Sequence, residues 1–250
     1  MLYQKTLARL KGSVLVVCGG SYDAQMLRAC GITDAVISNL SPNGHGNQGT
    51  TYEGFEWSHQ DAEALTYADG SFDWCVVNAG LHHCASPHKA LIEMLRVSRV
   101  GVLVVESRDS LLMRAAMWFG MTPAYEIETV ALNGYDMGGL RNGSVPNFIY
   151  RWTEREVRKT IASAYPERTH DIEFFYDILL PTRRLSMSSL PKRIAFYLLA
   201  VGVKCFHAVA KRQCNQFAFV VRKGPPQPWI QDGGLRKDFV KVKLSEYWHQ

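Results

Sequence analysis

Residues Val14 to Val17 form an uninterrupted apolar run, and a glycine-rich turn follows it directly. Such a short apolar run is typical of a strand that is buried on both faces of a parallel sheet. After the turn, the segment AQMLRAC spaces its apolar and small residues as an amphipathic helix does. A strand, a tight turn and a helix can bring backbone N–H groups and a helix N-terminus up to a ligand, but they also form ordinary connections. The downstream pattern decides between these two interpretations.

Apolar runs continue to alternate with helical or loop segments along the chain. Further strands are predicted at Ala35–Asn39, around Phe55 and Trp57, at Phe72–Asn78 and at residues 101–107. The segment PHKALIEMLRVSRV has the apolar spacing of a helix, and HDIEFFYDILL and NQFAFVVRK add a sixth and a seventh strand. This order predicts a doubly wound, mostly parallel α/β sheet that binds its ligands at the carboxyl ends of the strands.

Composition narrows the class of protein. An apolar content of 47% over 250 residues indicates a globular chain with a sizeable core rather than a disordered one. The net charge of +5 permits contact with phosphate or anionic lipid, but no basic stripe interleaved with aromatic residues is visible, so no nucleic-acid partner is expected. The six cysteines include no CxxC pair and no signal peptide is recognised, which predicts reduced thiols in a cytoplasmic protein.

The segment QDAEALTYADGSFDWCVVNAGLHHCASPHKALIEMLRVSRVGVLVVE resembles the class I S-adenosylmethionine-dependent methyltransferases, in the small-molecule branch that includes quinone-biosynthesis enzymes. It is similar to that family's succession of DAE, SFD, a strand, LHH, a proline and a helix ending in ALxEMxRV. With the glycine turn, the resemblance covers about Val14 to Glu106. It implies a Rossmann-like, doubly wound, seven-stranded sheet with an antiparallel last strand. It also implies S-adenosyl-L-methionine as cofactor and methyl transfer as the reaction.

Several positions depart from the pattern of this family. Val16 stands where the family usually has an acid, Cys18 replaces the first glycine of the turn, and Tyr22 replaces a later one. Asn39 replaces the acid that binds the ribose hydroxyls, and an amide lacks the charge-assisted hydrogen bond of a carboxylate. These departures keep a second interpretation open, in which the chain is a non-catalytic protein of this fold that binds a partner or a membrane.

The resemblance assigns cofactor contacts to residues at the ends of four predicted strands. These residues are Cys18, Gly19, Gly20 and Ser21 beside the methionine and ribose, Asn39 and Leu40 beside ribose and adenine, Asp61 and Ala62 at the adenine edge, and Asn78 facing the reacting methyl. Asp61 has a second interpretation that does not exclude the first. It is also placed to cap a helix, with Glu63 in the first turn.

Two residues are candidates for a general base. His82 follows the fourth predicted strand, and imidazole has a suitable intrinsic pKa, although His82 could equally hold the turn; for His83 the turn-holding role is favoured. Glu106, at the end of the fifth predicted strand, is the second candidate. No metal is predicted, because no grouped carboxylates are evident and the spacing of Cys75, His82, His83 and Cys84 matches no common zinc pattern.

The second half of the chain is expected to hold the acceptor. Residues 131–147 are rich in glycine and predict a mobile lid over the substrate site, or an ordinary surface connection, with Tyr135, Arg141 and Asn142 as substrate-binding candidates. The apolar segment at about 190–212 is too short and too interrupted to span a membrane. It is predicted to be a cap helix that walls the substrate pocket, or a helix in peripheral contact with an anionic membrane.

Together these features predict a methyltransferase domain over residues 1–224 and a C-terminal tail over 225–250. The tail either docks on a neighbouring chain, as in a homodimer, or stays mobile. The function expected is O-methylation of a small-molecule acceptor, such as a sugar, a lipid-linked glycan or a natural-product intermediate.

Overall fold

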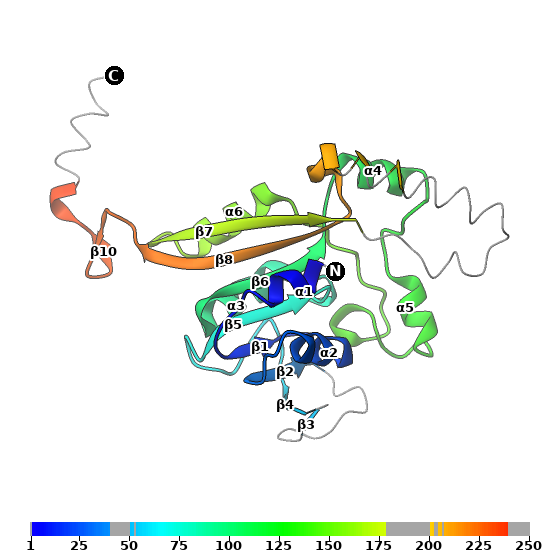
Figure 1. Ribbon diagram of the computed structural model, residues 1–250, viewed down its shortest axis with the longest axis horizontal. Helices are drawn as coiled ribbons and strands as arrows, with labels where there is room; N and C mark the ends of the chain where they lie inside the picture. The colour runs from blue at the N-terminus through cyan, green and yellow to red at the C-terminus, as the bar shows by residue number, and fades with distance from the viewer. Residues whose placement is uncertain are drawn as a thin grey trace.

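A computed structural model describes residues 2–40, 51–52, 54–178, 201–202, 205–206 and 208–239. Within these residues the main sheet has eight strands in the order β3-β4-β2-β1-β5-β6-β8-β7 (Figure 1). The strands are β1 Val14–Val16, β2 Ala35–Asn39, β3 Thr51–Tyr52, β4 Phe55–His59, β5 Phe72–Asn78, β6 Ser98–Ser107, β7 Arg168–Asp177 and β8 Gln216–Pro226. A separate two-stranded hairpin consists of β9 Ile230–Gln231 and β10 Gly234–Leu235.

The pairing of the strands confirms the predicted mixed sheet. Strand β1 lies in parallel between β2 and β5, and β6 continues the parallel part beyond β5. Strand β8 runs antiparallel to both β6 and β7, so the last strand of the main sheet is inserted next to the edge. The seven predicted strands are all present, and the two-residue β3 adds an eighth at the opposite edge.

Helices follow the parallel strands β1, β5 and β6, as is typical of a doubly wound fold. They are α1 Leu2–Leu7, α2 Ser21–Ala29, α3 Pro87–Val97, α4 Leu111–Trp118, α5 Ile127–Leu132 and α6 Glu154–Ala164, with short 3-10 turns η1 Leu81–His83, η2 Leu140–Asn142 and η3 Lys211–Gln213. Helix α6 begins with a capping box, in which the Thr153 hydroxyl accepts from the Glu156 N–H at 3.2 Å. The predicted lid at residues 131–147 begins in the last turn of α5 and contains η2.

Each face of the sheet packs into its own apolar core. Alternate residues of β5 serve opposite sides: Val77 belongs to the cluster that includes Leu91 of α3, and Val76 belongs to the cluster that includes Leu27 of α2. All four side chains are fully buried. Burial on both faces is why the parallel strands consist of consecutive apolar residues.

Some predictions concern residues that the structure does not describe. The cap helix expected at about 190–212 lies largely outside the described residues, as do residues 240–250 of the tail. Membrane contact through the cap helix, a homodimer and the domain boundary at residue 224 therefore stay predictions. Within the described residues, no helix is both long and apolar enough to cross a membrane.

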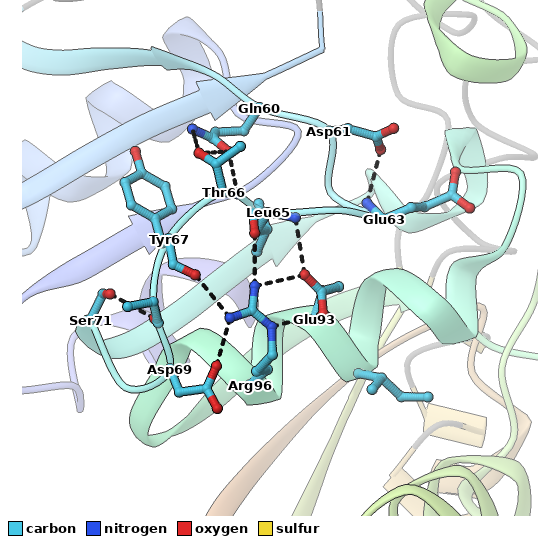
Figure 2. Close-up of polar contacts among 12 residues, drawn as sticks. Gln60, Asp61, Glu63, Leu65, Thr66, Tyr67, Asp69, Ser71, Glu93 and Arg96 are labelled. Carbon is cyan, nitrogen blue, oxygen red and sulfur yellow. Dashed lines mark hydrogen bonds and ion pairs between the residues drawn. The ribbon is translucent and has the colours of Figure 1, made fainter.

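The loop between β4 and β5 is held in place by Arg96 in the last turn of α3 (Figure 2). The guanidinium donates to the carbonyl oxygens of Leu65 and Tyr67 at 2.7 and 2.8 Å, and to the Asp69 carboxylate at 2.7 Å. It also donates to both carboxylate oxygens of Glu93 at 2.8 and 2.9 Å, and Glu93 accepts from the Leu65 N–H in turn. The loop has little regular structure, so these hydrogen bonds define its path.

The start of the same loop is fixed by Gln60. Its side-chain oxygen accepts from the Thr66 N–H at 3.0 Å, and its amide donates to the Ser58 hydroxyl at 3.0 Å. Asp61 and Glu63 therefore lie between two fixed points of the loop, Gln60 and the residues that Arg96 binds (Figure 2).

We expect Arg96→Lys to destabilise the fold by about 1–3 kcal/mol, because an ammonium keeps the charge but cannot reach four acceptors at once. Urea denaturation measures this loss, and hydrogen exchange at the Leu65 amide should show the loop opening first. Arg99→Lys is the matched control, because Arg99 is exposed and forms its ion pair with Asp73. Equal stability of the two variants would contradict the anchoring role.

Helix α2 begins against a buried carboxyl group. Asp23 accepts the Gly20 N–H at 2.9 Å through Oδ2 and the Tyr3 hydroxyl at 2.9 Å through Oδ1. Burial raises the pKa of Asp23 to about 6, although these two hydrogen bonds oppose the shift. The glycine turn after β1 thus depends on an acid that the core holds partly protonated.

This raised pKa predicts that stability falls as pH rises through about 6. The native Asp23 binds its proton more tightly than the unfolded chain does, so the stabilisation is complete below the unfolded pKa of about 4 and is lost above the folded one. Between about pH 4.5 and about pH 7.5, the unfolding free energy of the wild type should fall by about 2 kcal/mol more than that of Asp23→Asn. Chemical denaturation at both values tests this, with exposed Asp171→Asn as control. Parallel pH profiles for wild type and Asp23→Asn would refute it.

Candidate active site

A cavity of about 470 Å³ lies at the carboxyl ends of β1, β2, β4 and β5. Its volume is within the usual range for small-molecule sites. One wall comes from the strand ends and the loop after β4, and the other from the segment between Thr129 and Asn142. This is the edge of the sheet at which the fold is expected to bind ligands.

Five of the predicted cofactor residues line this cavity: Cys18, Asn39, Leu40, Asp61 and Ala62. Four others do not line it: Gly19, Gly20, Ser21 and Asn78. Gly19 is turned toward the core, where an added Cβ would lie 2.8 Å from Val16 and 2.9 Å from Ile37. Of the four turn residues that were predicted to contact the cofactor, Cys18 is therefore the one that lines the cavity.

The turn after β1 holds its shape without the usual residues. Cys18 adopts a left-handed conformation with a φ of 53°, which is costly for any residue but glycine. The Asn39 amide donates to the Gly19 carbonyl at 3.1 Å, and its oxygen accepts from the Leu40 N–H at 2.7 Å. Asn39 thus links the end of β2 to the turn, a role that an acid could not fill in the same way because a carboxylate has no donor.

Asp61 has one carboxylate oxygen inside the loop and one facing Arg141. Oδ1 accepts from the Glu63 N–H at 2.9 Å, and Oδ2 pairs with the Arg141 guanidinium at 2.8 Å. Burial alone would raise the pKa of Asp61, but these two partners outweigh it and lower the pKa. The prediction that Asp61 caps a helix is wrong, because a turn and not a helix follows Asp61. The Asp61 carboxylate accepts from the Glu63 N–H within that turn.

Glu63 is a site residue that sequence reasoning did not assign to the site. Its buried carboxylate accepts the N–H groups of Ala85 and Ser86, each at 2.9 Å, and pairs with Arg141 at 3.2 Å. Ser86 is the N-cap of α3, so Glu63 joins the loop after β4 to the start of that helix. The sequence signal that could have assigned Glu63 to the site is its position two residues after Asp61.

The predicted lid reaches the cofactor end of the cavity. Arg141 and Asn142 line the cavity, whereas Tyr135 is 72% exposed and does not. All three residues have a positive φ, so this glycine-rich segment is tightly turned. Arg141, predicted to bind the substrate, thus contacts Asp61, which is predicted to bind the cofactor.

His82 and Glu106, the two candidate bases, form a buried pair outside the cavity lining. His82 Nδ1 lies 2.8 Å from Glu106 Oε2, and Glu106 Oε1 accepts the Leu81 N–H at 2.7 Å. His82 Nε2 faces Glu126 at 3.4 Å. Burial disfavours the charged ring, but Glu106 and then Glu126 raise the pKa of His82 to about 10. A cationic imidazole between two carboxylates has no lone pair with which to accept a proton.

His83, expected only to hold the turn, is the histidine that lines the cavity. Its Nε2 lies 3.3 Å from Glu126, and its Nδ1 lies 3.4 Å from the Gly139 carbonyl of the lid. Burial and the neighbouring His82 lower the pKa of His83. Glu126 was missed in the sequence because it precedes a short helix in a segment without clear periodicity.

The lining residues fit S-adenosylmethionine. The Asp61 carboxylate supplies an acceptor for an adenine amino group, and Leu40 and Ala62 supply apolar contact beside it. The small residues Ala79 and Gly80 leave room at the end of β5, where a Cβ on Gly80 would lie 2.6 Å from that of Cys18. Asn39 and Cys18 would border the ribose and methionine portions.

Comparison with known proteins agrees with this geometry. Residues 14–105 match the family model described as a methyltransferase domain. Over 50 residues the chain is 46% identical to a demethylmenaquinone methyltransferase of Renibacterium salmoninarum, covering 20% of this chain and 21% of that protein. Over 48 residues it is 48% identical to the ubiquinone/menaquinone biosynthesis C-methyltransferase UbiE of Bdellovibrio bacteriovorus, covering 18% and 20%. The chain thus spans about a fifth of the length of these curated relatives.

Solved structures share the fold over most of the chain. A methyltransferase of Thermotoga maritima, described as a possible histamine N-methyltransferase, has a TM-score of 0.52 at 13% identity and covers 89% of this chain and 88% of its own. A putative methyltransferase of Haloferax volcanii, solved with the Trm112 activator, has a TM-score of 0.52 at 16% identity, with coverage of 90% and 88%. The chain therefore has the class I S-adenosylmethionine-dependent methyltransferase fold, and residues 14–105 are similar to a methyltransferase domain.

Proposed function

We propose that this protein transfers a methyl group from S-adenosylmethionine to an oxygen atom of a small-molecule acceptor. The observation that carries the proposal is the single cavity at the strand ends, where Cys18, Asn39, Leu40 and Asp61 meet although they are far apart in the sequence. We place the reaction in the cytoplasm, where the six free thiols would stay reduced.

The bound cofactor supplies an activated sulfonium methyl group, so the protein mainly has to position the acceptor and exclude water. Asp61 orients the adenine end, and the lid residues Met137 and Arg141 close the cavity on the solvent side. We assign His82 and Glu106 to positioning the loop that carries His83, because their mutual contact and their burial leave neither free to accept the proton of a substrate.

The lining of the second wall suits an acceptor with hydroxyl groups. Thr129 and Asn133 line the cavity near the lid, and both can hydrogen-bond to a hydroxyl. Helices α4 and α5 expose large apolar side chains outside it: Leu111, Trp118 and Leu132. A sugar, a lipid-linked glycan or a natural-product intermediate can offer hydroxyl groups to the cavity and apolar groups to the surface outside it.

The matched curated relatives favour a second candidate, carbon methylation of a quinone-type ring. A panel of purified acceptors separates the candidates by the methylated product, with a hydroxylated sugar, a prenol-linked sugar and a quinol as members. Cofactor binding without turnover on any of them would favour the non-catalytic interpretation.

The first test is isothermal titration with S-adenosylmethionine and S-adenosylhomocysteine. We expect Asp61→Asn to weaken binding by about 10- to 100-fold, because a charge-assisted hydrogen bond is worth about 1.5–3 kcal/mol and the amide still caps the turn. Exposed Asp171→Asn is the control. Wild-type affinity in Asp61→Asn, or no binding by the wild type at millimolar ligand, would refute the assignment.

Arg141→Gln should speed cofactor association by about 2- to 5-fold, because adenine then has no guanidinium to displace from Asp61 and an exposed ion pair is worth up to about 1 kcal/mol. Stopped-flow tryptophan fluorescence measures the rate. Arg114→Gln removes a similar exposed ion pair with Asp109 and should leave the rate unchanged. A slower or unchanged rate in Arg141→Gln would mean that Arg141 does not compete with the ligand.

A further inference from the structure

Three metal-ligand side chains converge beside the cavity. His82 and His83 come from η1 after β5, and Glu126 comes from the residue that precedes α5. The two Nε2 atoms lie 3.4 and 3.3 Å from the two carboxylate oxygens of Glu126. One ligand atom from each residue can be chosen so that all three lie within 4.8 Å of one another. Two imidazoles and one carboxylate thus face a common point.

The opposite side of each imidazole ring is held by an oxygen acceptor. His82 Nδ1 faces Glu106 at 2.8 Å, and His83 Nδ1 faces the Gly139 carbonyl at 3.4 Å. Glu106 is itself fixed by the Leu81 N–H. When Nδ1 donates to an acceptor, Nε2 is left as the ligand atom, and metal-binding histidines are oriented by contacts of this kind.

The three side chains differ in their exposure. The His82 side chain is 6% exposed, whereas those of His83 and Glu126 are 30% and 22% exposed. His83 also lines the cavity. Three protein ligands with an open side correspond to the coordination of zinc sites that keep a position for water or substrate.

We propose that His82, His83 and Glu126 bind a divalent first-row transition metal, with zinc or cobalt as the best fit. Imidazole and carboxylate ligands suit these ions, whereas magnesium prefers an all-oxygen shell. Binding releases the Nε2 proton of His82 to solvent, and the ion then balances the carboxylates of Glu106 and Glu126. The sequence predicted no metal because Glu126 lies far from the two histidines in the chain, and the proposal does not depend on methyl transfer.

Metal titration of the purified full-length chain, stripped with a chelator, tests the site. Zinc binding is followed by calorimetry, and cobalt binding by its visible absorption, which reports the ligand types. We expect one ion per chain, and a loss of at least about 10–100-fold in affinity for both Glu126→Gln and His83→Gln, because removing a direct ligand should cost no less than removing an outer contact. Unfolding curves of the metal-free variants show whether they fold.

Matched controls separate this site from other ligands. Glu128→Gln changes an exposed carboxylate in α5, two residues after Glu126, and His88→Gln changes a histidine that pairs with Glu156. Both should bind metal as the wild type does. No metal uptake by the wild type, or unchanged affinity in Glu126→Gln and His83→Gln, would overturn the proposal. So would thiolate absorption bands that disappear in Cys84→Ser, since Cys84 lines the adjacent cavity.

Discussion

The shape of the cavity depends most on the hydrogen bonds that the Arg96 guanidinium donates. Parallel strands create a crevice at their carboxyl ends, but they do not determine the path of the loops that enclose it. The loop after β4 runs past α3 with little regular structure, and Arg96 binds two of its carbonyl oxygens and one of its carboxylates. Because Glu93 holds Arg96 from the same helix, a rigid element sets the position of Asp61 and Glu63.

Glu63 extends this network from the loop to the lid. Its carboxylate binds two N–H groups at the start of α3, where the helix dipole also favours a negative charge. The same carboxylate and that of Asp61 both pair with Arg141. The Arg141 side chain is half exposed, and an ion pair with such a group is individually weak, so a ligand can replace the contact between Arg141 and Asp61.

The strands could be predicted from the sequence, because burial on both faces leaves a direct signal in runs such as Val14–Val17. The roles of single polar residues could not, because they depend on partners that are distant in the chain. Arg96 stands within a predicted helix, but all of its acceptors except Glu93 lie in the loop before β5. His82 has the chemistry of a base, yet Glu106 and Glu126 take both of its ring nitrogens. Asn39 lacks the expected charge, but its donor is what holds the turn.

One short segment of the lid touches both functional parts of the site. The Gly139 carbonyl faces His83 Nδ1, and Arg141, two residues later, pairs with Asp61 and Glu63. The segment that contacts Asp61, a predicted cofactor residue, is thus also part of the environment of the imidazole that lines the cavity. We therefore expect a change at the Arg141 ion pairs to alter the His83 contact as well, because a single residue separates Gly139 from Arg141.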